Sequence, residues 1–168
     1  HGAPMPEVPG PDGSVPLDFG VTGREVRVVD AGYDDSTDRL GPPEIHTWCR
    51  FRDAPSEQRL HAALAAQSVT HWTIAASMRP HEGIGEAAAH VTLTTGPITA
   101  SVWLLDEIDV TEWLLYANPS PWAGRGLSQG EGKVFTQDGR LVATYAVQAM
   151  VRRMDRPVDA LGGPNRAM

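Results

Sequence analysis

A strand, a turn and a hairpin follow one another in residues 112–143, which read Glu112-Trp-Leu-Leu-Tyr116, then Ser120-Pro-Trp-Ala-Gly-Arg-Gly-Leu127, then Phe135-Thr-Gln-Asp-Gly-Arg-Leu-Val-Ala143. The first segment is apolar and aromatic, as strands commonly are. The third carries Asp138-Gly139 between apolar pairs, which is the signal of a two-residue type I′ hairpin. We therefore expect Gly126–Arg153 to fold back on itself as two antiparallel strands.

Further strands and one helix are expected on the N-terminal side of this region. The helix should run from Ser56, as its N-cap, to about Met78, because alanine and leucine favour helix and Leu60, Leu64 and Trp72 fall near a 3.6-residue period. Alternating or β-branched residues predict strands over Arg24–Ala31, Ile45–Phe51, Ala89–Thr95, Ile98–Leu105 and Glu112–Ala117. One helix against a run of antiparallel strands is the pattern of an α+β domain.

The two ends of the chain read differently from its middle. Residues 1–23 contain Pro4, Pro6, Pro9, Pro11 and Pro16, a composition typical of an extended tail or linker. Residues 155–168 are again rich in glycine and proline and are expected to form a flexible tail. The prediction is a single domain over residues 24–154.

Composition excludes several classes of function. A formal net charge of -7 argues against a nucleic-acid binder, because phosphate contacts need clustered lysine and arginine. No apolar run is long enough to span a bilayer. Cys49 is the one cysteine, so it predicts a small buried hydrophobe and a reducing compartment, which we take to be the cytoplasm.

Several motifs in order resemble the acyl-CoA thioesterase II family, in its C-terminal half. They are the three segments of residues 112–143 together with Thr47-Trp48-Cys-Arg50, Leu60-His-Ala-Ala-Leu64 and Met78-Arg-Pro-His81. The resemblance implies a hotdog fold, an antiparallel curved sheet wrapped around one long central helix. It also implies fatty acyl-CoA thioesters as substrates and no cofactor. Since one hotdog leaves a sheet edge open, the resemblance further implies a homodimer or pairing with another hotdog domain.

The family resemblance also nominates catalytic residues. Members of the family use an Asp, a Ser or Thr, and a Gln to orient a water against the thioester carbonyl. An ungapped comparison puts Thr99 where the Asp is expected, and threonine cannot act as a base at neutral pH. Ser120 takes the hydroxyl position. Val147 takes the glutamine position, with Gln148 one residue later on the opposite face of its strand unless a β-bulge intervenes.

Asp106 is the candidate replacement for the missing carboxylate, because it ends the strand that should carry the base. The alternative is that Asp106 belongs to a solvated turn.

Three residues are candidates for substrate binding. Trp122, beside Ser120, is expected near an acyl tunnel, and Gly124 and Arg125 lie in the following turn. Arg125 could meet the nucleotide phosphates of CoA or form a structural salt bridge with Glu131. Six histidines are present, but none has the spacing of a zinc site, so no metal is expected and we predict surface or capping histidines.

Two functions remain open at this point. The first is a thioesterase with a degenerate catalytic set, and the second is a catalytically silent hotdog that binds acyl-CoA or serves as a structural partner. Release of free thiol from acyl-CoAs, lost in Ser120→Ala, would separate them.

Overall fold

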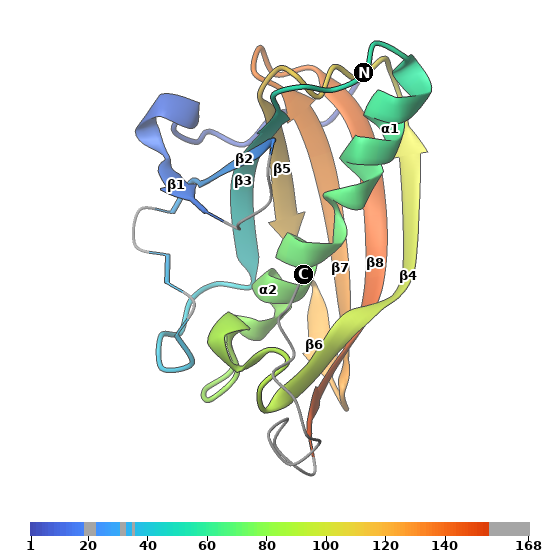
Figure 1. Ribbon diagram of the computed structural model, residues 1–168. Coiled ribbons are helices and arrows are strands. Elements are labelled where there is room, and N and C mark those ends of the chain that lie inside the picture. Colours follow the sequence, from blue (N-terminus) through green and yellow to red (C-terminus); the bar gives the residue numbers. More distant parts are fainter. Residues whose placement is uncertain (19–22, 31–32, 35, 155–168) are drawn as a thin grey trace.

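The computed structural model describes residues 1–18, 23–30, 33, 34 and 36–154, and Figure 1 shows it as one curved sheet with helices across its inner face. The expected C-terminal tail at 155–168 lies outside the described residues. The helical elements are η1 (Pro11–Gly13), α1 (Gln58–Gln67), α2 (Thr70–Met78) and η2 (Glu86–Ala88). The strands are β1 (Val15–Leu17), β2 (Arg24–Val28), β3 (Glu44–Phe51), β4 (Leu93–Leu104), β5 (Leu114–Pro119), β6 (Trp122–Gly124), β7 (Leu127–Thr136) and β8 (Leu141–Arg153).

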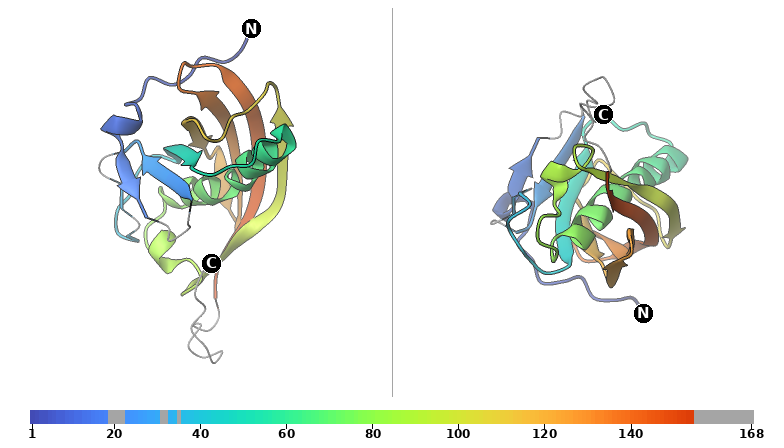
Figure 2. Two further views of the ribbon diagram at one scale, coloured as in Figure 1. Left: turned by 45° about the horizontal axis from the view of Figure 1, so that its top comes forward. Right: turned by 90° about the horizontal axis from the view of Figure 1, so that it is seen from below.

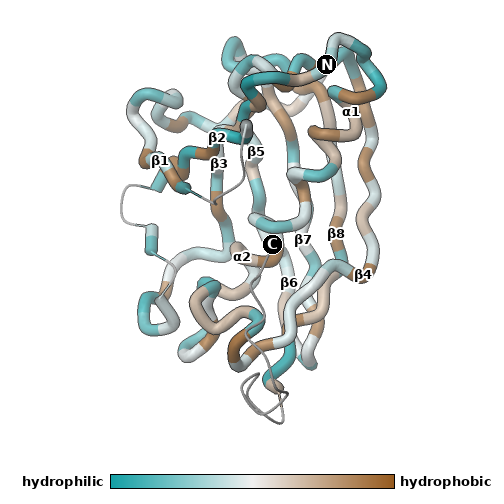
Figure 3. The backbone as a smooth tube through the Cα atoms, in the orientation of Figure 1, coloured by the Kyte–Doolittle hydropathy of each residue, from teal (hydrophilic) through white to brown (hydrophobic). Residues whose placement is uncertain are grey.

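Every strand pairing in this sheet is antiparallel, in the order β1-β2-β3-β5-β7-β8-β4, and β6 pairs with β7. Figure 2 shows the sheet curling around α1 and α2. The predicted α+β hotdog fold is confirmed. The described part of the chain leaves β4 with a free edge, and hydropathy alternates from residue to residue over its second half, residues 98–104 (Figure 3).

The central helix is interrupted, whereas the sequence predicts one continuous helix. It begins at Gln58 after Glu57, which makes no side-chain cap, so the expected N-cap role of Ser56 is wrong. At the break, the amides of Ser68 and Val69 donate to carbonyls three residues earlier, and the Ser68 hydroxyl donates to Leu64 O at 3.1 Å. A tightened turn with serine bonding back to its own backbone bends a helix.

Two local predictions about turns and strands need correction. The expected strands at 89–95 and 98–105 are one strand, β4, with a register shift between Pro97 and Thr99. The Asp138-Gly139 hairpin exists, but only Gly139 has a positive φ (91°), so its loop is not type I′. Among the described residues, a two-residue turn with positive φ at both positions occurs at Arg125-Gly126 (54° and 77°), between β6 and β7.

The core between helix and sheet depends on two glycines of β7. A Cβ at Gly130 would lie 1.7 Å from Thr73 Cγ2, and one at Gly132 would lie 2.0 Å from Tyr145 Cζ. Their bare backbone therefore lets α2 and the Tyr145 ring approach the strand. The Thr73 and Tyr145 hydroxyls each donate a hydrogen bond to Asn118 Oδ1. The buried Asn118 carbonyl oxygen therefore has hydrogen-bond partners.

The N-terminal segment packs against the outer face of the sheet, so the expectation of an unpacked tail at residues 1–23 is wrong for its described part. Met5 and Val8 cover an apolar cluster made of Trp48, Trp113, Leu115, Ala117 and Phe135. The Trp48 indole donates to Pro9 O at 2.9 Å. Proline is tolerated here because β1, which contains Pro16, is an edge strand.

Helices long and apolar enough to cross a membrane do not occur in the described residues.

Candidate functional site

Three of the residues nominated from the sequence lie in one row across the outer face of the sheet. The register pairs Trp122 on β6 with Gln129 on β7, Gln129 with Gln148 on β8, and Gln148 with Thr99 on β4. Directly opposed residues of antiparallel strands project from the same face, with Cβ atoms about 4.5–5.5 Å apart. The row is open to solvent, since Trp122, Gln148 and Thr99 are all exposed.

The side of β8 on which Gln148 lies follows from burial. Val147 is 1% exposed and belongs to the core under the helix, whereas Gln148 is exposed on the opposite face. The prediction that these neighbours face opposite ways is confirmed. The pairing of β8 with β7 and with β4 is continuous across Val147 and Gln148, and the register shifts of these pairings lie at Ile98 on β4 and at Val142 on β8.

Ser120 lies close to this row but is turned inward. It is 5% exposed, and its hydroxyl donates to the backbone carbonyl of Gln129 at 2.9 Å. Its amide donates to Pro43 O at 2.7 Å. In this arrangement Ser120 holds the β5–β6 turn against β7.

Asp106 is remote from the other candidates. Its carboxylate accepts a hydrogen bond from Arg140, which holds the pKa of Asp106 below its ordinary value. Its amide contacts Val142 O, six residues along β8 from Gln148, which corresponds to about 20 Å at the usual rise of a strand. The structure therefore does not bring Asp106 to the row.

Gly124 and Arg125 line a small apolar cavity at the end of α2. The cavity measures about 160 Å³, and its walls include Met78, Ile84, Leu127 and Val151. Within the described residues Arg125 forms no ion pair with Glu131, so the structural alternative for Arg125 is not supported. Arg125 is exposed to solvent beside this cavity.

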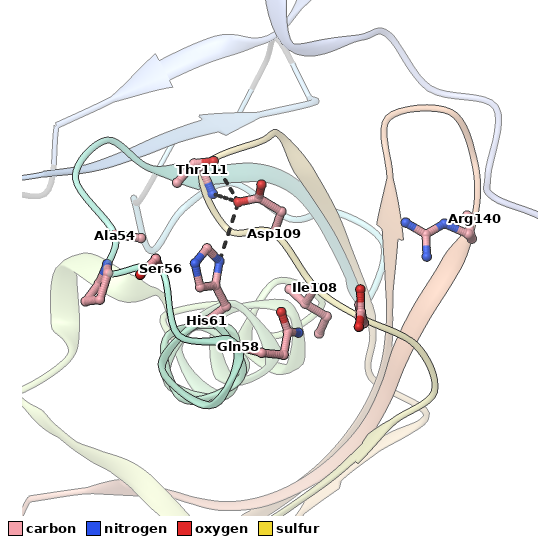
Figure 4. Close-up of a pocket in the computed structure, with 10 residues that line it drawn as sticks. Ala54, Ser56, Gln58, His61, Ile108, Asp109, Thr111 and Arg140 are labelled. Carbon is pink, nitrogen blue, oxygen red and sulfur yellow. Dashed lines mark hydrogen bonds and ion pairs between the residues drawn. The ribbon is translucent and has the colours of Figure 1, made fainter.

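A larger cavity lies elsewhere, around the first turn of α1 (Figure 4). It measures about 510 Å³ and is lined mainly by polar side chains. His61 is buried in its wall, where Nδ1 accepts a hydrogen bond from the Val110 amide at 3.1 Å and lies 3.4 Å from Asp109 Oδ1. The prediction of a surface or capping histidine is wrong here. His61 and Ala65 form the buried stripe of α1 at i and i+4, a signal that the sequence carries.

A second histidine pairs with a carboxyl group on the outer side of α2. His71 Nε2 lies 2.8 Å from Glu86 Oε1, and burial raises the pKa of Glu86 to about 7.

Cys49 is buried, as expected, and burial raises the pKa of its thiol to about 11. Over the described ranges, no three His, Cys, Asp or Glu side chains gather as metal ligands.

Comparison with known proteins gives one consistent result. Residues 2–151 match the family described as acyl-CoA thioesterase C-terminal domain. The chain is 28% identical over 114 residues to acyl-CoA thioesterase 2 of Haemophilus influenzae, which covers 66% of this chain and 38% of that protein. It is 25% identical over 130 residues to human acyl-coenzyme A thioesterase 8, covering 76% of this chain and 39% of the relative.

Solved structures agree with the sequence relatives. The crystal structure of an acyl-CoA thioesterase II from Mycobacterium marinum superposes with a TM-score of 0.66 at 28% identity, over 92% of this chain and 58% of that one. The structure of a tesB protein from Mycobacterium avium subspecies paratuberculosis shares the fold, with a TM-score of 0.66 at 23% identity over 90% and 55% of the two chains. The chain thus spans about two fifths of these curated relatives. It belongs to the acyl-CoA thioesterase C-terminal domain family.

Proposed function

We propose that this chain acts as the C-terminal hotdog half of an acyl-CoA thioesterase and takes part in hydrolysing fatty acyl-CoA to free acid and CoA. The observation that carries the proposal is the exposed row of Gln148 and Thr99 beside Trp122, in a chain of this family. Hydrolysis of a thioester needs a held water and donors for the carbonyl oxygen, and amide and hydroxyl groups in a fixed row can supply both.

Each residue near the row has a proposed role. The Gln148 amide donates to the carbonyl oxygen as negative charge develops there, and the Thr99 hydroxyl orients the water. Ser120 is a positioning residue, since its bond to the Gln129 carbonyl keeps β6 beside β7. Trp122 offers a flat apolar surface to the substrate. Arg125 attracts the nucleotide phosphates.

The free edge of β4 is the proposed surface for pairing with a second hotdog, either another copy of this chain or a separate domain. Ile98 (57% exposed), Trp103 and Leu104 are apolar side chains left open along this edge. Long, unpaired apolar edges are templates for strand addition. Such pairing would also shield Thr99, which belongs to the same strand, from bulk water.

Sedimentation at micromolar concentration tests this pairing. We expect a dimer for the chain as given and a monomer for Ile98→Lys, because a charge at the bulge opposes edge pairing. Leu40→Lys, at an exposed apolar position away from β4, is the matched control and should stay dimeric. A monomeric unmodified chain would contradict self-pairing.

Thiol release from a panel of acyl-CoAs tests the activity itself. Gln148→Ala should lower kcat by about 10²–10³-fold, the usual effect of losing one oxyanion donor. Gln137→Ala, in the exposed β7–β8 loop, removes the same group elsewhere and should leave kcat unchanged. Acyl-CoA binding without any thiol release above background would instead identify a silent binding module.

A further inference from the structure

The proposed site lacks a base at position 99, and the sheet register brings another carboxylate to the same face. Glu131 on β7 pairs with Ala146 on β8, and Ala146 pairs with Ser101 on β4. This second row lies next to the row of Gln129, Gln148 and Thr99 and is offset from it by two residues on each strand. Glu131 faces away from the helices, because its neighbour Gly130 packs against Thr73 of α2 and successive residues of a strand face opposite sides of the sheet.

The geometry lets the Glu131 carboxylate reach the candidate site. Glu131 and Gln148 are diagonal neighbours on adjacent antiparallel strands, a relation with separations of about 7–8 Å that long side chains bridge. Ala146 stands between Glu131 and Ser101 and adds only a methyl group. Space for a water molecule therefore remains over the middle strand.

The Glu131 side chain is not committed to another partner. It is exposed, and no ion pair joins it to any residue of the described chain. Lys133, two residues along β7, is the nearest charged residue on this face of the strand. Asp106, the carboxylate nominated from the sequence, is engaged elsewhere, since it pairs with Arg140.

We infer that Glu131 is the general base for thioester hydrolysis at this site, in the place of an aspartate at position 99. This inference rests on the proposed thioesterase function. The carboxylate takes a proton from a water held near Gln148, and the water oxygen forms a bond with the thioester carbonyl carbon. The resulting oxyanion is stabilised by the Gln148 amide. As the carbonyl reforms, the carbon–sulfur bond breaks, and the departing CoA thiolate takes the proton from Glu131.

Steady-state kinetics of thiol release test this role. Glu131→Gln should lower kcat by about 10²–10⁴-fold, the range for loss of a general base, with KM changed by less than about threefold. Glu107→Gln removes an exposed carboxylate in the β4–β5 connection and should leave both constants unchanged. Adding Thr99→Asp to Glu131→Gln returns a carboxylate to the neighbouring row. The kcat of this double variant should be at least tenfold higher than that of Glu131→Gln.

The outcomes separate this inference from the function on which it rests. Undiminished kcat in Glu131→Gln, together with loss of activity in Gln148→Ala, overturns the role of Glu131 and leaves the thioesterase proposal standing. No thiol release from the unmodified chain, alone or paired with a second hotdog, overturns both. Urea unfolding of each variant checks the fold, which exposed substitutions of this kind should change by less than about 0.5 kcal/mol.

Discussion

Replacing Gly130 by alanine should separate α2 from the sheet, because the added Cβ has no room. It would lie 1.7 Å from Thr73 Cγ2 and 3.1 Å from Thr73 Cβ. Rotating the Thr73 side chain away would give up its hydrogen bonds to Val69 O and Asn118 Oδ1. Overpacking costs about 1–3 kcal/mol and a lost buried hydrogen bond about 1 kcal/mol, so we expect the free energy of unfolding to fall by about 3 kcal/mol.

Urea denaturation followed by tryptophan fluorescence measures this loss. Gly96→Ala is the matched control in a strand, because no atom lies within 4 Å of its added Cβ, and it should change stability by less than about 0.5 kcal/mol. Thr73→Ser removes the clashing methyl and keeps the hydroxyl, so the double variant with Gly130→Ala should recover about 2 kcal/mol. A Gly130→Ala protein as stable as the unmodified chain, or a loss that Thr73→Ser does not relieve, would refute the reasoning.

Two further predictions concern buried titratable groups. Because burial raises the pKa of Glu86 from 4.5 to about 7, the folded chain binds the extra proton between these values, and stability falls as pH rises through this window. Relative to Glu86→Gln, the free energy of unfolding should drop by at most about 3 kcal/mol between pH 4.5 and 8, and parallel stability curves would contradict this. Cys49, with its thiol pKa of about 11, should react with DTNB at pH 8 only after unfolding in urea, and rapid labelling of the native chain would show that the thiol is accessible.

Elements with strong local signals could be predicted from the sequence. The valines of β2, the alanine-rich first helix and the β7–β8 hairpin each depend on periodicity or turn chemistry within a few residues. The observed boundaries of these elements differ from the predicted ones because tertiary contacts determine where an element ends. Ser68 interrupts the helix by bonding back to Leu64, and Pro97 and Thr99 flank a bulge that only the pairing with β8 defines.

The N-terminal prolines illustrate why composition misled. Proline removes an amide donor, so a proline-rich stretch reads as a linker in isolation. In the folded chain this stretch covers the apolar cluster around Trp48 and Phe135, and its carbonyls accept hydrogen bonds from Trp48 and Arg27. These contacts are made with residues that are distant in the sequence, so the proline-rich stretch carries no local signal of its packing.

Family and fold class were thus encoded in linear motifs, since turn residues and hydrophobic alternation act over short separations. Which residues come together in the candidate site depends on the pairing of the strands in the sheet. Thr99, Glu131 and Gln148 are far apart in the chain, and only the pairing of β4, β8 and β7 puts them on one face. A shift of one residue in that pairing would turn each side chain to the other face, which is why no reading of the strands one at a time could assemble them.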